Sequence, residues 1–259
     1  MDVHFHLTDL TVDPHVHTAY ESPMRVLFSL VRYCRRRPFR TVVFGFLFLF
    51  TALVGRFAVW PPVNALTAKN PETTAFIEYR QAQWRESGRE VTVRRTWVPL
   101  GRISRHLRKA VVVAEDSAFW DHDGFDLQGI RNAMERNIAR RQFAAGGSTI
   151  TQQLAKNLYF SPEKSVLRKI QEAIVAKRLE VALSKERILE LYLNSVEWGD
   201  GVFGAEAAAR HYFRVSAANL TERQAATLAA MLPSPLRRNP DSPIVRRHAG
   251  TILARMRIE

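Results

Sequence analysis

Residues 146–157 read GGSTITQQLAKN, and this stretch indicates the fold and the kind of site more clearly than any other part of the chain. Its two glycines allow close backbone approach, and the pair Ser148 and Thr149 is suited to cap a helix that begins behind it. The first amides of such a helix favour an anion. The spacing of a Walker nucleotide loop is absent. Four side chains along the predicted helix offer donors to sugar hydroxyls or a cation to phosphate: Gln152, Gln153, Lys156 and Asn157.

Upstream of this stretch, residues 115–124 read EDSAFWDHDG and follow the apolar run 110–114. A carboxylate at the end of a buried element is desolvated, which raises its pKa and suits Glu115 to act as a general acid or base. The plainer interpretation is a polar turn with a satisfied carboxylate. A metal site at residues 121–123 is disfavoured, because neighbours on a turn rarely converge on one ion.

Downstream lies a basic cluster of Lys164, Arg168 and Lys169, with Glu172 one helical turn beyond Arg168. Alone, Arg168 and Glu172 would form an ordinary ion pair worth roughly 0.2–0.5 kcal/mol. Together with Lys156 and the upstream carboxylate, the cluster provides what displacement of a diphosphate from a sugar carbon needs. These needs are a base, cations for the leaving group and a carboxylate that orients them.

The apolar spacing from residue 71 onward is mostly helical, as in residues 188–192. Residues 221–224 fit a capping box before an apolar run, and prolines break the chain before a last helix near Ile244. Only residues 90–99 alternate like a strand. The sequence therefore predicts a mainly α fold.

Residues 39–60 read FRTVVFGFLFLFTALVGRFAVW. The uncharged part, 41–55, would span only about 22 Å as a helix, but all 22 residues span about 33 Å, enough for a hydrocarbon core of about 30 Å. In that arrangement the side chain of Arg56 extends toward the lipid head groups, and Trp60 lies at the membrane–water interface. The absence of a polar face disfavours the alternative, a buried core helix. We therefore predict a transmembrane helix.

Five arginines between Arg32 and Arg40 precede the uncharged part of this segment. Because positive charge stays on the cytoplasmic side, we predict a single-pass protein of the cytoplasmic (inner) membrane. Its N-terminus would be cytoplasmic and its catalytic domain periplasmic or extracytoplasmic. A signal peptide cleaved after Ala65 is the alternative. The leader histidines fit a solvated, disordered tail better than a metal site, and translation from Met24 instead of Met1 stays open.

The charge balance points to an anionic partner, because 38 Lys and Arg against 25 Asp and Glu leave a net charge of +13. The part beyond the apolar segment keeps 31 basic against 21 acidic residues. No nucleic-acid-binding module is visible, so anionic lipid or a phosphorylated substrate fits better. The single cysteine, Cys34, excludes an intramolecular disulfide and a zinc module built on cysteines.

Five motifs in this order resemble the peptidoglycan glycosyltransferases of glycosyltransferase family 51. The resemblance covers residues 97–256. The chain ends soon after the last motif without a Ser-x-x-Lys penicillin-binding domain, so it is similar to the monofunctional, biosynthetic form. The motifs are EDSAFWDHDG, GGSTITQQLAKN, RKIQE (168–172), KERILELYLN (185–194) and RRHAGTILARM (246–256).

The resemblance implies a lysozyme-like helical domain with a small jaw lobe on one N-terminal transmembrane helix. The expected organisation is a cytoplasmic leader (1–38), the transmembrane helix (39–60), a linker and jaw-adjacent segment (61–95) and the glycosyltransferase domain (96–259). The implied reaction polymerises lipid II. The 4-hydroxyl of its GlcNAc attacks C1 of the terminal MurNAc of the growing chain, forms a β-1,4 bond with inversion and releases undecaprenyl diphosphate.

The resemblance also implies roles for single residues. Glu115 would deprotonate the attacking hydroxyl, and Glu172 would orient the cations or a divalent ion. The motif 185–194 reads as scaffold. Lys164 departs from the family, whose members often have Arg there, so its bidentate contact with phosphate is in doubt. The expected diphosphate ligands are Lys156, Lys164, Arg168 and Lys169. The expected substrate contacts are Ser148, Thr149, Gln152, Gln153, Asn157 and His122.

No cofactor or protein metal site is predicted, although Mg²⁺ or Mn²⁺ stays open. The expected partners are lipid II, the growing glycan chain, membrane lipids and other cell-wall synthesis proteins, with no nucleic acid. Two alternatives remain: a lysozyme-like hydrolase, whose substrate carries no diphosphate, and a cationic scaffold, in which Glu115 would be dispensable. The basic cluster favours the transferase over the hydrolase.

Overall fold

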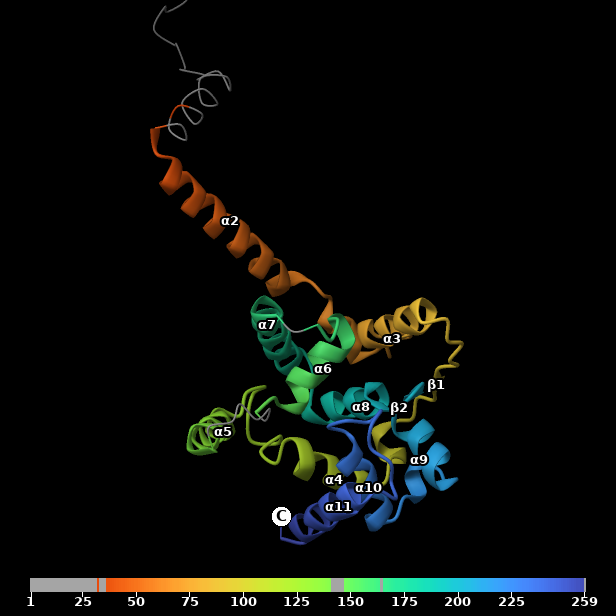
Figure 1. Cartoon of the computed structure of the whole chain (residues 1–259). Coiled ribbons are helices and arrows are strands. Elements are labelled where there is room, and N and C mark those ends of the chain that lie inside the picture. Colours follow the sequence, from red (N-terminus) through yellow and green to blue (C-terminus); the bar gives the residue numbers. More distant parts are fainter. Residues whose placement is uncertain (1–31, 33–35, 141–146, 164, 259) are drawn as a thin grey trace, which may run out of the picture. The chain divides into compact units, whose positions relative to one another are not determined.

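The computed structural model describes residues 32, 36–140, 147–163 and 165–258. It divides into two compact units, residues 1–52 and 53–259. Lys164, Gly146 and nearly all of the predicted leader lie outside the described residues. The elements in chain order (Figure 1) are α2 (Pro38–Val59), η1 (Val63–Thr67), α3 (Ala75–Glu86), β1 (Arg94–Arg95), η2 (Leu100–Arg102), α4 (Arg105–Glu115), α5 (Leu127–Arg140), α6 (Ile150–Tyr159), α7 (Val166–Ala182), α8 (Lys185–Ser195), β2 (Glu197–Gly199), β3 (Val202–Phe203), α9 (Ala205–Phe213), η3 (Ala217–Asn219), α10 (Glu222–Met231) and α11 (Pro243–Met256).

The apolar segment forms α2, whose residues are mostly exposed and of which only Phe57 is buried. In the described part of the chain, one helical stretch, Pro38–Thr67, is long and apolar enough to cross a membrane. The last turn of α2 has carbonyls without helical partners. Arg178 of α7 donates to two of them, at 3.1 Å to the carbonyl of Phe57 and 2.7 Å to that of Val59. The end of α2 is therefore fixed to α7.

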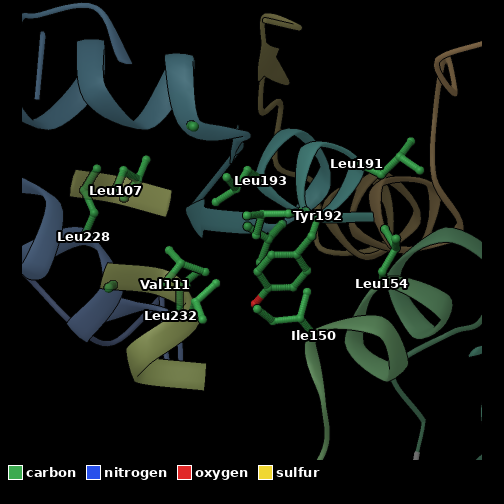
Figure 2. Close-up of a cluster of buried hydrophobic side chains, with 14 of the residues drawn as sticks. Leu107, Val111, Ile150, Leu154, Leu191, Tyr192, Leu193, Leu228 and Leu232 are labelled. Atoms are coloured by element: carbon green, nitrogen blue, oxygen red, sulfur yellow. The ribbon is translucent and has the colours of Figure 1, made fainter. Parts of the chain in front are cut away.

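The core of residues 53–259 lies where α4, α6, α8 and α10 meet (Figure 2). The apolar run of α4 is buried as predicted, since Ala110 and Val111 are fully inaccessible. Helix α8 contributes several large side chains to this core, including that of Tyr192. Helix α10 packs on both α4 and α11, and α6 packs on α7 and α8. The prediction of a mainly helical fold is confirmed.

Polar side chains of α8 bind the backbone of the segment 98–100. This is in keeping with the scaffold role predicted for the motif 185–194. Asn194 accepts from the Val98 amide and donates to the Val98 carbonyl, both at 2.9 Å. Glu190 accepts from the amide of Leu100 at 2.9 Å. These bonds also explain why the strand predicted for residues 90–99 is short. Val98 pairs with a side chain, so only β1 joins the sheet.

The small sheet has the order β1-β3-β2. Strand β1 runs parallel to β3, with Arg94 opposite Val202, and β2 runs antiparallel to β3. The predicted capping box at residues 221–224 starts α10, and a second box, Thr149 with Gln152, starts α6. The last helix begins at Pro243, beside the expected start at Ile244.

Candidate active site

Glu115 is the last residue of α4, so the buried helix delivers its carboxylate to the edge of the core. Gln153 of α6 donates from Nε2 to Oε2 of Glu115 at 2.9 Å. The hydroxyl of Tyr192 in turn donates to Oε1 of Gln153 at 3.0 Å. The tyrosine is fully buried and thus fixes the amide, which orients the carboxylate.

Burial raises the pKa of Glu115 above its ordinary value. The hydrogen bond from Gln153 and the positive charges of Lys156 and Arg238 oppose this effect, in that order. Burial likewise raises the pKa of Tyr192, and the charges of two nearby carboxylates raise it further. Tyr192 therefore stays protonated as a donor, and Glu115 has the increased proton affinity that a general base needs.

The neighbouring carboxylate, Asp116, connects the first two motifs. Its Oδ2 accepts from the amide of Ile150 at 2.9 Å, and Nε2 of His122 lies 2.9 Å from its Oδ1. Because the Gly124 amide donates to Nδ1 of His122 at 3.0 Å, the ring proton lies on Nε2, which donates to Asp116. Burial raises the pKa of Asp116, against the opposing bonds from Ile150 and His122.

This arrangement bears on one expectation from the sequence. The first amides of α6 were expected to favour an anion, and the Ile150 amide binds the carboxylate of Asp116. The amide of Gln152 bonds to Oγ1 of Thr149. The protein thus supplies an anion of its own at this helix end. A diphosphate site formed by the cation side chains stays a prediction.

The structure brings the predicted cations together on α6 and α7. Glu172, 2% exposed, pairs with Arg168, and its Oε2 lies 3.5 Å from Nζ of Lys169. Lys169 also donates to Oγ of Ser148 at 2.9 Å. Burial lowers the pKa of Lys156; the charge of Glu172 opposes this effect, and that of Arg168 adds to it.

Each oxygen of Glu172 faces a cation, Arg168 at Oε1 and Lys169 at Oε2. No group of three or more His, Cys, Asp or Glu residues that could hold a metal ion occurs among the described residues. The Nε of Arg168 is buried without a hydrogen-bond partner. This cluster therefore suits an anionic ligand better than a cation.

A cavity of about 500 Å³ opens beside Glu115. Ser148 and Thr149 line it from one side, and Asn132 of α5 lines it from another. Arg255 of α11 adds a cation to the wall. Glu115 thus lies beside a polar cavity, while Lys156, whose charge acts on it, belongs to the cation cluster.

The predicted substrate contacts fall into two groups. Ser148 is exposed, and Gln153 is half-buried beside Glu115. Thr149, Gln152 and Asn157 are buried, the first two as the capping box of α6. His122 is half-buried and has both ring nitrogens in internal hydrogen bonds. Their contact with substrate stays a prediction, and the structure gives Gln152 and His122 positioning roles.

Sequence reasoning missed several residues around the site. Asp116 lies in the motif EDSAFWDHDG, but no role was predicted for it. Tyr192 lies in the motif 185–194, which was predicted to be scaffold. Arg255 lies in the fifth motif, RRHAGTILARM, which could have identified it. Asn132 and its neighbours on α5 had no signal, because no motif covers that segment.

A helical domain with the half-buried carboxylate of Glu115 beside a polar cavity and a cation cluster nearby is what a lysozyme-like glycosyltransferase requires. The profile of the family described as Transglycosylase matches residues 82–257 of this chain. The chain therefore belongs to the transglycosylase family. The predictions of this family, of its helical fold and of a glycosyltransferase are confirmed.

Relatives extend the match beyond the profile. A biosynthetic peptidoglycan transglycosylase of Dechloromonas aromatica (strain RCB) is 49% identical over 215 residues, which cover 80% of this chain and 93% of that protein. One of Aromatoleum aromaticum is 52% identical over 188 residues, covering 72% and 82%. One of Nitrosospira multiformis is 44% identical over 211 residues, covering 81% and 92%.

Proposed function

We propose that this chain polymerises lipid II into β-1,4-linked glycan strands. Glu115 takes the proton from the 4-hydroxyl of the GlcNAc of lipid II. The oxygen forms a bond to C1 of the terminal MurNAc of the growing chain, and the bond from C1 to undecaprenyl diphosphate breaks with inversion. Transglycosylation in peptidoglycan synthesis follows from the family and from relatives of 44–52% identity. The lipid substrate, the leaving group and the stereochemistry are the proposal.

The observation that carries the proposal is a base and a separate cation cluster on adjoining helices. Glu115 has a raised pKa and touches no cation within hydrogen-bond distance among the described residues. Arg168, Lys169 and Lys156 gather around Glu172 instead. A base serves the incoming hydroxyl, and cations stabilise the charge that builds on a departing diphosphate. Hydrolysis of finished glycan would need no such cluster.

The test is polymerisation of labelled lipid II by the purified full-length chain. We expect glycan strands, one undecaprenyl diphosphate released per bond formed, and β linkages in the product. Glu115→Gln should abolish all of this, whereas the matched control Glu86→Gln, an exposed residue of α3, should not. Solubilisation of finished sacculi without release of diphosphate would contradict the proposal and indicate a hydrolase.

We further propose that α2 spans the inner membrane with the leader in the cytoplasm and the domain of residues 96–259 outside, joined by 61–95. Five arginines lie on the N-terminal side of the uncharged stretch 41–55, against Arg56 and Lys69 on its other side, and this bias supports the orientation. A reporter that works only outside the cytoplasm, fused after Glu259, should be active. The full-length protein should stay with membranes in high salt. Release by salt, with a mature N-terminus near Leu66, would contradict the anchor.

Membrane lipids and the growing glycan are further proposed partners, as are other cell-wall synthesis proteins. A requirement for Mg²⁺ or Mn²⁺ stays a prediction, and assays with EDTA and added metal test it. The role of Lys164 also stays a prediction, which Lys164→Arg tests. A bidentate guanidinium should match or exceed the activity of the lysine.

A further inference from the structure

A second cavity of about 500 Å³ lies next to the catalytic one. The two share Val113 and Ser117 in their walls, so they adjoin around the end of α4. Three cations line the second cavity from the first turns of that helix: Arg105, Arg108 and Lys109. We call this cavity, with these cations and Trp120, the basic groove.

The cations of the basic groove are not neutralised by the protein. Among the described residues, none of the three forms an ion pair, although Glu186 of α8 also lines the groove. The Nε of Arg108 is buried and has no hydrogen-bond partner. A buried donor without a partner is costly unless a ligand pairs with it. The groove therefore favours an anion.

Apart from Ser117 and Glu186, the other residues that line the groove are apolar or aromatic. Val112 and Leu189 line it, and Trp120 exposes 50% of its surface there. A bare phosphate would gain nothing from such walls, and a membrane surface would meet a cavity instead of a protruding patch. A short peptide with carboxylates fits both features, because its carboxylates pair with arginine and its carbon atoms cover the tryptophan.

The groove also has a fixed spacing from the reaction centre. Arg105, Arg108 and Val112 recur at three and four residues and thus share one face of α4. Glu115 follows Arg108 by seven residues, two turns of the same helix, or about 10 Å along its axis. A substituent on a sugar bound in the catalytic cavity could cross Ser117 into the groove.

We propose that the basic groove binds the acidic peptide carried by the sugar units of the glycan substrate. This inference rests on the proposed function, since only a peptidoglycan precursor brings such a peptide to this cavity. Arg108 and Arg105 pair with its carboxylates, and Trp120 packs against its aliphatic part. The groove thereby positions substrate without taking part in the chemistry.

The first experiment compares two forms of lipid II, one with free carboxylates on its peptide and one with these carboxylates amidated. Arg105→Gln combined with Arg108→Gln should raise KM for the free form about tenfold, as expected for a lost charge-assisted contact, and leave kcat within about twofold. KM for the amidated form should hardly change. The matched control combines Arg246→Gln with Arg247→Gln, exposed on α11, and should alter neither. Equal changes for both substrates would overturn the proposal.

The second experiment needs no catalysis. The probe is a soluble pentapeptide with free glutamyl and C-terminal carboxylates, titrated into the detergent-solubilised full chain by calorimetry. The wild type and Arg108→Lys should bind it, and the doubly substituted groove variant should not, with unchanged circular dichroism. Binding without any polymerisation of lipid II would reject the proposed function but keep the groove. Absence of peptide binding to an active wild type would overturn the groove. If the groove variant instead loses affinity for anionic vesicles alone, the groove contacts lipid and the proposal is wrong.

Discussion

Glu115 and Glu172 are both withdrawn from solvent near the same site, but their surroundings differ. Glu115 accepts a hydrogen bond from the neutral amide of Gln153, and its pKa is raised by burial. Glu172 lies between Arg168 and Lys169. The first carboxylate keeps a high proton affinity, whereas the second holds cations in place. The difference shows that the neighbours of a glutamate, together with its burial, decide whether it is suited to act as a base.

The largest effect should come from Glu115. Glu115→Gln keeps the volume of the side chain but removes the proton acceptor, so kcat for polymerisation should fall by at least about 100-fold. Glu172→Gln should cost about tenfold, because the cations remain but lose their orientation. Initial rates with labelled lipid II measure both. A larger loss in Glu172→Gln than in Glu115→Gln would reverse the two roles.

The next largest loss of activity should follow removal of the cations around Glu172. Lys156→Ala and Arg168→Ala should each lower kcat more than about tenfold, or about 1.4 kcal/mol, because charge grows on the leaving group in the transition state. Lys177→Ala removes a half-exposed cation on the same helix as Arg168 and should have little effect. Turnover at saturating lipid II is the measurement. An unchanged kcat with a raised KM would mean that the cluster acts only in ground-state binding.

A smaller effect concerns the pH dependence of Glu115. The base works only when deprotonated, so the rate of the wild type should fall on the acid side with an apparent pKa above the ordinary glutamate value of about 4.3. The hydrogen bond from Gln153 lowers the pKa of Glu115, so Gln153→Leu should raise it and move the acid limb to higher pH. Profiles of kcat/KM measure the shift. A shift toward lower pH would contradict this reading.

The smallest effect on activity should follow Tyr192→Phe. Gln153 loses the donor to its Oε1 but can still reach Glu115, so the acid limb should move less than in Gln153→Leu. The unsatisfied amide oxygen should lower the free energy of unfolding by about 1–3 kcal/mol. Urea titration checks the second value. Unaltered stability would show that the buried hydroxyl does not fix the amide.

Local sequence sufficed for the helix starts and for the placement of the base. Thr149 with Gln152 and Thr221 with Gln224 are the same capping box, and both form. Their surroundings were not predictable, because burial depends on tertiary packing. Thr149 is 2% exposed and donates to the Gly124 carbonyl at 2.7 Å, whereas Thr221 is exposed.

Contacts between distant motifs could not be predicted from the sequence, because they too depend on tertiary packing. No pattern in the sequence pairs Asp116 with the Ile150 amide, 34 residues away, or places Arg255 in the catalytic cavity. From the sequence alone, the side of α4 that carries Arg105 and Arg108 is indistinguishable from an ordinary solvent-exposed helix face. Only the packing of α8 and Trp120 against it makes a groove.

The occupied start of α6 has a consequence for inhibitors. Because the Ile150 amide is bound to Asp116, a compound that imitates the proposed diphosphate leaving group would depend mainly on the side chains of Lys156, Arg168 and Lys169. A single substitution can remove any one of these cations and so weaken such a compound. Under the proposed function, the same substitution would also remove a cation that stabilises the leaving group. Escape from the compound would then be linked to a loss of polymerisation.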